Sequence, residues 1–220
     1  MKEFEKGFSL RERKQARTKV FLAKEFLEGL KRSKYEDIPI KSICEKVEVS
    51  EGTFYNYFPQ KTDLINYVVT LYGTKMMIQT NKSVPGDDPI KWLKMYFKNA
   101  TQMMSDLVNL SNEIFATIVR ERVRPQSINF TRLEFLYMFP DMDKEVEIEK
   151  IFSIEDCFDR AVGSISRKGI LRKDISVKDL TIALKMILGG TPIIRALYDD
   201  KEMVDIVQKQ LSVVLKGVMK

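Results

Sequence analysis

Histidine is absent from this 220-residue sequence, and cysteine occurs only twice. Without histidine the chain cannot form Ser-His or Cys-His catalytic pairs, and it lacks the commonest protein ligand of metals. Cys44 and Cys157 form no CxxC pair, so we interpret them as small buried hydrophobic residues rather than as a redox switch. There is no glycine-rich loop of the kind that cradles phosphates. We therefore expect no enzyme activity, metal or cofactor, although carboxylate or lysine chemistry stays formally open.

Long hydrophobic runs are also missing. No stretch of about 18 uninterrupted apolar residues occurs, which predicts that no helix crosses a membrane. Met1–Leu10 is charged and lacks the apolar segment of a signal peptide. These absences predict a cytoplasmic protein with no membrane partner. Apolar residues still make up 44% of the chain, enough for one large or two smaller packed domains.

Positive charge is modest in total but concentrated in one place. The net charge is +6, whereas Arg11–Lys24 alone carries six basic residues against the single acidic residue Glu12. We interpret this segment as phosphate support for a nucleic-acid partner. The alternative is a solvated helix face.

Apolar residues recur every three or four positions, and strict alternation is rare, which predicts an all-α protein. In the first part of the chain the pattern predicts a helix around Ala16–Leu30, two short helices, and a long helix over Leu64–Thr80. The short helices are expected at about Ile40–Lys46 and at Thr53–Tyr57, the latter capped by Ser50. Prolines and a glycine between residues 81 and 89 mark a boundary. We predict an N-terminal domain over residues 1–80 and a C-terminal domain over residues 81–220.

The C-terminal part shows further amphipathic segments and one irregular stretch, Val123–Asp143. Its last two predicted helices, about Val177–Leu197 and Lys201–Gly217, each carry a long apolar stripe, and Gly189 and Gly190 permit close approach of another backbone. We expect a homodimer formed through these two helices. A monomer could instead bury the stripes against its own body.

Two short helices separated by about four residues and braced by longer ones describe a helix-turn-helix motif, at about residues 39–58. The second helix exposes polar and aromatic residues, which suits a DNA major groove about 12 Å wide. Thr53 could contact a base, and Tyr55, Tyr57 and Lys61 could reach phosphates that fix the register.

The same residues carry a family resemblance. The segments Tyr35–Ile38, Ile40–Cys44 and above all Val49–Leu64, with its YxYFxxK-like arrangement, resemble the TetR/AcrR family of transcriptional regulators over about residues 12–72. The resemblance implies an N-terminal three-helix DNA-binding domain and a C-terminal helical domain that dimerises and encloses a small-molecule site. It implies DNA contacts at Lys41, Thr53, Tyr55, Tyr57 and Lys61, with Ser42, Gly52 and Asn56 on the same surface, and core positions at Val49, Phe54 and Phe58.

Two acidic residues depart from the family pattern. Glu48 occupies a turn position where the family often has glycine, so we expect left-handed backbone strain there. Glu51 begins the second short helix, where it favours the helix dipole but could repel phosphate. Both place negative charge near the surface that would face DNA.

The C-terminal domain is rich in aromatic and methionine side chains that could line a site for an apolar or aromatic ligand. Ordinary core packing explains the same pattern. Glu155 falls on an apolar stripe, where it could neutralise a cationic ligand or pair with an internal Arg or Lys. The candidate ligand residues are Trp92, Tyr96, Met103, Met104, Phe115, Tyr137, Phe152, Glu155 and Phe158.

Together these features predict a ligand-responsive, dimeric transcriptional regulator. We expect a repressor that binds a palindromic double-stranded operator and is released by a small apolar or aromatic effector. One alternative is a ligand-independent or activating regulator. Another is a helical interaction module or enzyme that does not bind DNA.

Overall fold

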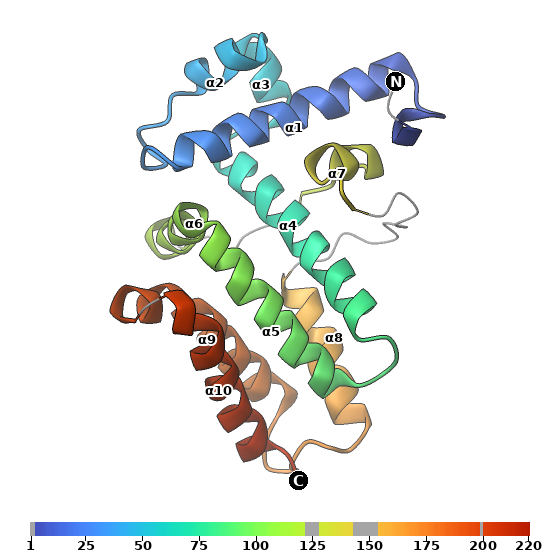
Figure 1. Ribbon diagram of the computed structural model, residues 1–220, viewed down its shortest axis with the longest axis vertical. Coiled ribbons are helices and arrows are strands. Elements are labelled where there is room, and N and C mark those ends of the chain that lie inside the picture. The colour runs from blue at the N-terminus through green and yellow to red at the C-terminus, as the bar shows by residue number, and fades with distance from the viewer. Residues whose placement is uncertain (1–2, 122–127, 143–153, 199) are drawn as a thin grey trace. The chain divides into compact units, whose positions relative to one another are not determined.

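A computed structural model describes residues 3–121, 128–142, 154–198 and 200–220, and these are almost entirely helical (Figure 1). The predicted all-α class is confirmed. Within the described ranges the only β pairing is an isolated antiparallel bridge between Leu171 and Met219. The elements are η1 (Glu3–Glu5), α1 (Leu10–Leu30), α2 (Ile40–Val47), α3 (Glu51–Tyr57), α4 (Lys61–Ser83), α5 (Pro89–Asp106), α6 (Val108–Glu121), α7 (Arg132–Met138), α8 (Ile154–Arg167), α9 (Val177–Leu197) and α10 (Asp200–Val218).

The chain forms two compact units, and neither is continuous in sequence. Unit 1 comprises Met1–Tyr72 and Ala116–Ile151, and unit 2 comprises Gly73–Phe115 and Phe152–Lys220. This division differs from the continuous domains 1–80 and 81–220 that the sequence predicts. The boundaries between the units fall inside helices α4 and α6. A domain boundary predicted from a loop therefore does not coincide with either of them.

Side-chain caps start two of the first three helices of unit 1. Ser9 and Glu12 form a reciprocal capping box at the start of α1, with Glu12 N donating to Ser9 Oγ over 3.2 Å. The apolar stripe of α1, including Val20, Ala23 and Phe26, is buried. The predicted short helices are present as α2 and α3, and Ser50 caps α3 as expected.

Helix α7 corrects the prediction of an irregular stretch over Val123–Asp143. The Thr131 hydroxyl caps α7 by accepting the Glu134 amide at 3.2 Å. Every residue from Leu133 to Phe139 is buried. A helix that is buried on all sides shows no amphipathic period, which is why spacing rules do not find it.

Unit 2 is a helical bundle in which α5 packs against α8 and α10, and α9 packs against α8 and α10. Tyr96, Phe97 and Phe158 are fully buried at its centre, with ring centroids 5.7–6.5 Å apart. Aromatic contacts at this spacing contribute about 0.5–1.5 kcal/mol beyond area burial.

The prediction that no helix crosses a membrane stays a prediction, and helix α9 is the described segment that bears on it. By length and composition α9 could cross a membrane, with a mean hydropathy of 1.5 over 18 residues, of which 28% are buried. The core helices of soluble proteins can have the same composition. In unit 2, Leu180, Leu184 and Leu188 of α9 join the buried core, while other apolar residues of α9 remain exposed.

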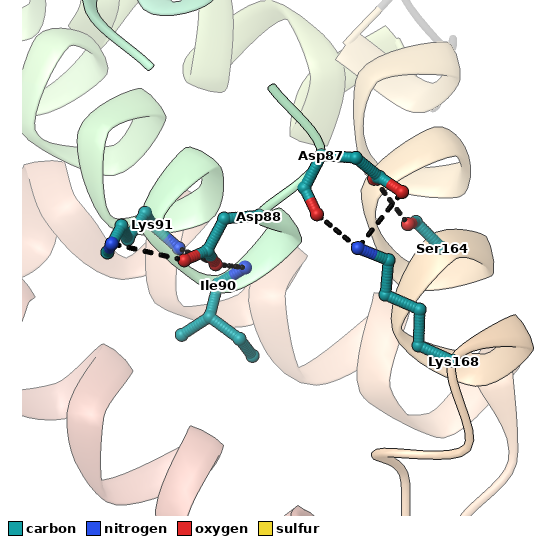
Figure 2. Close-up of polar contacts among 6 residues, drawn as sticks. All are labelled: Asp87, Asp88, Ile90, Lys91, Ser164 and Lys168. Atoms are coloured by element: carbon teal, nitrogen blue, oxygen red, sulfur yellow. Dashed lines mark hydrogen bonds and ion pairs between the residues drawn. The ribbon is translucent and has the colours of Figure 1, made fainter. Parts of the chain in front are cut away.

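The connection between α4 and α5 is fixed by two adjacent aspartates (Figure 2). Asp88 caps α5 by accepting the amides of Ile90 and Lys91 at 3.1 and 3.0 Å. Asp87 points to α8, where Ser164 Oγ donates to its carboxylate at 3.1 Å and Lys168 Nζ lies 2.9 Å from it. The Lys168 ammonium also donates to the Asp87 carbonyl.

The Asp87–Lys168 contact predicts a pH-dependent contribution to stability. The Lys168 hydrogen bond, and then that of Ser164, lowers the pKa of Asp87 below its ordinary value of 3.8. Its stabilising contribution is therefore present above the unfolded-state pKa and is lost as the pH falls through the lowered folded-state pKa. We expect Lys168→Met to cause a small drop in the unfolding temperature at neutral pH, because the pair is exposed. In acid the difference from wild type should shrink, as measured by thermal scans across pH. Lys94→Met, at an exposed position on α5, should show no such pH dependence, and equal behaviour of the two variants would contradict the assignment.

Candidate nucleic-acid interface

Helices α2 and α3 are joined by a three-residue turn, Glu48–Ser50, which closes a helix-turn-helix motif at the predicted position. Glu48 adopts the left-handed conformation, with φ 58° and ψ 44°, and its amide donates to Glu45 O at 3.2 Å. The Val49 amide donates to Cys44 O at 3.0 Å. Ser50 Oγ then accepts the Thr53 amide at 3.1 Å and starts α3. The predicted strain at Glu48 is thus present.

Replacing this residue with glycine should stabilise the protein. Glu48 is the only non-glycine residue with positive φ in the described ranges. The left-handed conformation costs a residue with a Cβ atom about 1–2 kcal/mol more than it costs glycine. Glycine also increases the conformational entropy of the unfolded chain, and this offsets part of the gain. We therefore expect Glu48→Gly to raise the free energy of unfolding by about 0.5–1 kcal/mol. Denaturant titration measures this. The control Glu48→Gln keeps the Cβ atom, so a similar gain in that variant would show that charge, and not backbone strain, is responsible.

One face of α3 anchors the helix in unit 1. Phe54 and Phe58 are fully buried, with ring centroids 5.6 Å apart, and Phe58 packs 5.3 Å from the ring of Tyr67 on α4. Their predicted core role is confirmed, whereas Val49 is only half-buried. Since Phe54 faces the core, the opposite face of α3 faces outward.

That outward face forms one wall of an open groove of about 770 Å³. Thr53, Asn56 and Tyr57 of α3 line it on one side. The N-terminal half of α1 forms the other wall with residues that repeat at helical spacing, namely Leu10, Arg11, Lys14, Gln15 and Thr18. The structure therefore combines three of the predicted DNA-contacting residues with two of the basic residues of Arg11–Lys24.

The basic segment divides into two groups with different surroundings. Arg11 and Lys14 are exposed and line the groove. The other cations turn toward η1 and α7: Arg13 and Arg17 lie 3.8 and 3.5 Å from Glu5, Lys19 lies 2.9 Å from Glu134, and Lys24 donates to Tyr137 O at 2.9 Å. Sequence reasoning could not separate the two groups because all six residues are cations on one helix. Gln15 and Thr18 could have been found from their helical spacing to Arg11 and Lys14, whereas nothing in the sequence marks Leu10.

The remaining predicted DNA contacts lie outside the groove lining. Lys61, at the start of α4, donates to the carbonyls of Tyr35 and Glu36 and lies 4.4 Å above the Tyr35 ring. It therefore holds the α1–α2 connection in this structure, and a phosphate contact by Lys61 stays a prediction. Four other predicted positions are partly or fully exposed on α2 and α3, namely Lys41, Ser42, Gly52 and Tyr55.

Cys44 lies on α2 and is buried, as predicted. Burial, followed by the charges of Glu51 and Glu45, raises the pKa of its thiol. A thiol held in its neutral form is a poor nucleophile and a poor metal ligand. Among the residues described, no group of three or more metal-ligating side chains gathers in one place. The side chain of Cys157 lies outside the described residues.

The predicted ligand residues do not all come together. Tyr96, Met104 and Phe158 belong to the buried core of unit 2, and Trp92, Met103 and Phe115 pack against it. Tyr137 belongs instead to unit 1, where it packs against η1 and α1, so its grouping with the others is corrected. Phe152 and the side chain of Glu155 lie outside the described residues.

No protein-family model and no curated protein matches the sequence. Solved structures do match along nearly the whole chain. A Thermus thermophilus FadR, described as a TetR-family transcriptional repressor in complex with lauroyl-CoA, aligns at 18% identity with a TM-score of 0.63, covering 93% of this chain and 95% of its own. A Bacillus subtilis FadR with stearoyl-CoA aligns at 15% identity and 0.58, covering 90% and 97%. A TetR transcription regulator from Haloarcula marismortui aligns at 15% and 0.59, covering 94% and 99%.

The fold and the groove define an all-helical protein with a helix-turn-helix unit and a second helical unit. The solved structures identify this arrangement as the fold of TetR-family transcriptional regulators, so the resemblance read from the sequence is confirmed at the level of the fold.

Proposed function

We propose that this protein is a DNA-binding transcriptional regulator that places α3 in the major groove of its operator. The observation that carries this proposal is the α1–α3 groove, where Arg11 and Lys14 face Thr53 and Asn56. The cations supply phosphate contacts, which position the protein without reading sequence. Asn56 supplies the amide that pairs with an adenine edge, and Thr53 presents a hydroxyl and a methyl group to the bases.

We further propose that the regulator acts as a homodimer formed through α9 and α10, which pack side by side in unit 2 (Figure 1). Large apolar side chains are exposed along one face of α9, namely Ile182, Met186, Ile193 and Leu197, and Val213 is exposed on α10. Burial of such a stripe by a second copy provides a hydrophobic driving force. A two-fold dimer presents two recognition helices about 34 Å apart, which matches a palindromic operator.

As the regulatory mechanism, we propose repression in the cytoplasm that is relieved by an apolar effector bound in unit 2. Two structural neighbours hold acyl-CoA molecules, which makes acyl chains the first effectors to test. Helix α4 runs through both units, so it can transmit a change in unit 2 to the DNA-binding face. To release the operator, an effector must favour the non-binding conformation by a few kcal/mol.

A ligand-independent regulator is the second candidate, and the packing of unit 2 favours it. Tyr96, Phe97 and Phe158 contact one another directly, and the groove beside Trp92 encloses only about 100 Å³. Ligand pockets in proteins occupy roughly 300–1,000 Å³. An effector that binds at this groove must therefore displace part of the surrounding core, whereas a ligand-independent protein keeps it closed.

Trp92 provides a direct test of effector binding because it is the only tryptophan in the sequence. Its ring stacks on Tyr96 at 5.1 Å, and its indole donates to Asn81 at 2.7 Å. We expect lauroyl-CoA or stearoyl-CoA to change the Trp92 emission saturably and to weaken operator binding at least about ten-fold. Free coenzyme A is the control for the headgroup. Unchanged emission and unchanged operator affinity across acyl chain lengths would favour the ligand-independent regulator.

The DNA-binding proposal itself is tested by selecting fragments of the source genome that bind the full-length protein, with and without acyl-CoA. We expect enrichment of a short two-fold symmetric sequence. An Asn56→Ala variant in a parallel selection separates specific recognition from general attraction to DNA. If the wild-type protein enriches no sequence at low salt, the proposal is wrong and a helical interaction module becomes the better description.

A further inference from the structure

Three helices of unit 1 meet at one buried carboxylate. Glu134 of α7 is 4% exposed, and its Oε2 atom lies 2.9 Å from Lys19 Nζ on α1. The same oxygen accepts the Tyr67 hydroxyl of α4 at 2.8 Å. Lys19 Nζ also lies 4.7 Å above the Tyr67 ring. One oxygen atom thus joins α1, α4 and α7.

A second set of contacts around Tyr137 fastens α7 to α1 and η1. The Tyr137 hydroxyl donates to Glu5 at 2.7 Å, and its carbonyl accepts from Lys24 at 2.9 Å. Arg17 lies 5.7 Å above the Tyr137 ring, and Phe4 of η1 meets the ring edge-on at 5.3 Å. The part of α1 from Arg17 to Lys24 is therefore held by α7 and η1, while Arg11 and Lys14 line the groove.

The Glu134 cluster is connected to both walls of the groove. Tyr67, which donates to Glu134, packs against Phe58, and Phe58 packs against Phe54 on the inner face of α3. On the other side, Lys19 belongs to α1, whose N-terminal half forms the opposite wall. The relative placement of α1 and α3 therefore depends on a continuous path of packed rings and buried polar contacts.

A buried ion pair is costly to desolvate and holds its partners in one geometry only while both are present. Removal of one partner leaves the other buried and uncompensated, so the surrounding helices must shift or admit water. Uncharged residues at both positions leave no buried charge that needs a partner. This asymmetry between single and double substitutions distinguishes a positioning contact from a direct contact with DNA.

We propose that Glu134 is a positioning residue for DNA binding, and that α7 with η1 forms an integral part of the DNA-binding unit by setting α1 relative to α3. This inference rests on the proposed DNA-binding function. It assigns to that function a segment far outside the N-terminal domain of residues 1–80 predicted from the sequence. Lys19 and Lys24 thereby hold the protein together and do not contact phosphate.

A double-mutant cycle on the full-length protein tests the inference, using the operator selected by the wild type. We expect Glu134→Gln and Lys19→Met each to weaken binding about ten-fold, and the double variant to recover to within about three-fold of wild type. The slope of log affinity against log salt should stay at its wild-type value in all three, because no phosphate contact is lost. Circular dichroism at the assay temperature verifies that each variant is folded.

Matched controls come from Glu28 and Lys31, an exposed pair at the end of the same helix. Glu28→Gln and Lys31→Met should leave operator affinity unchanged. If Lys19→Met lowers the salt slope by about 0.9 while Glu134→Gln binds like wild type, Lys19 contacts phosphate and the inference is overturned. A wild-type protein that binds no DNA would instead refute the proposed function.

Tyr67→Phe keeps the test decisive if Glu134→Gln fails to fold. This variant retains the ring that packs on Phe58 and removes only the donor to Glu134. We expect a loss of operator affinity of about three-fold with an unchanged salt slope. Wild-type affinity in folded Tyr67→Phe would overturn the positioning role.

Discussion

Asn56→Asp is expected to reduce operator affinity by at least about 100-fold while leaving the thermal stability of the protein unchanged. Asn56 is exposed on α3 and lines the groove opposite Arg11 and Lys14. The substitution keeps the size of the side chain but replaces its amide donor with a negative charge. Loss of a bidentate contact to adenine costs about 1–3 kcal/mol, and repulsion from phosphates adds to this. Fluorescence anisotropy with the selected operator measures the affinity.

Asn112→Asp is the matched control, because it makes the same chemical change at an exposed position on α6 that does not line the groove. It should bind like wild type. A companion variant, Lys14→Ala, should lower the salt slope by about 0.9 for one lost phosphate contact. If Asn56→Asp and Asn112→Asp bind equally well, the α1–α3 groove is not the DNA-binding surface.

Met186→Glu is expected to convert the dimer into a monomer and to weaken its self-association by at least about 100-fold. Met186 is 71% exposed and shares one face of α9 with Ile193 and Leu197, which are 67% and 72% exposed. Burying a charge without a partner at the centre of such an interface costs several kcal/mol. Operator affinity should fall in parallel, because a monomer engages one half-site. Analytical ultracentrifugation measures the association, and anisotropy measures the DNA binding.

The control for this experiment is Val119→Glu, which places the same charge at a 78% exposed apolar position on α6. It should leave the association constant unchanged. A Met186→Glu protein that remains dimeric would show that another face forms the dimer. A wild-type protein that is monomeric at all concentrations would refute the dimer itself.

Much of the fold could be predicted from local patterns in the sequence. Helical spacing of apolar residues predicted the all-α class, and the cap at Ser50 predicted where α3 begins. The helix-turn-helix motif and the left-handed turn at Glu48 were also predictable, because both depend on residues close together in the chain. Phe54 and Phe58 could be placed in the core for the same reason.

Local patterns in the sequence could not predict which segments of the chain make up unit 1. Helix α7 has no polar face, so it shows no period, and its partners on α1 lie more than 100 residues earlier in the chain. The ligand prediction for Tyr137 was misplaced for the same reason, since aromatic content does not say which unit a residue joins.

The sequence alone thus determined the helical class, the helix-turn-helix motif and the polar residues on the outward face of α3. Only the tertiary structure decided which cations of Arg11–Lys24 line the groove and which form internal contacts. All of these cations belong to one regular helix, so local propensity treats them alike. Buried carboxylates brought in by η1 and α7 separate them, because a buried charge requires a partner wherever in the chain that partner lies.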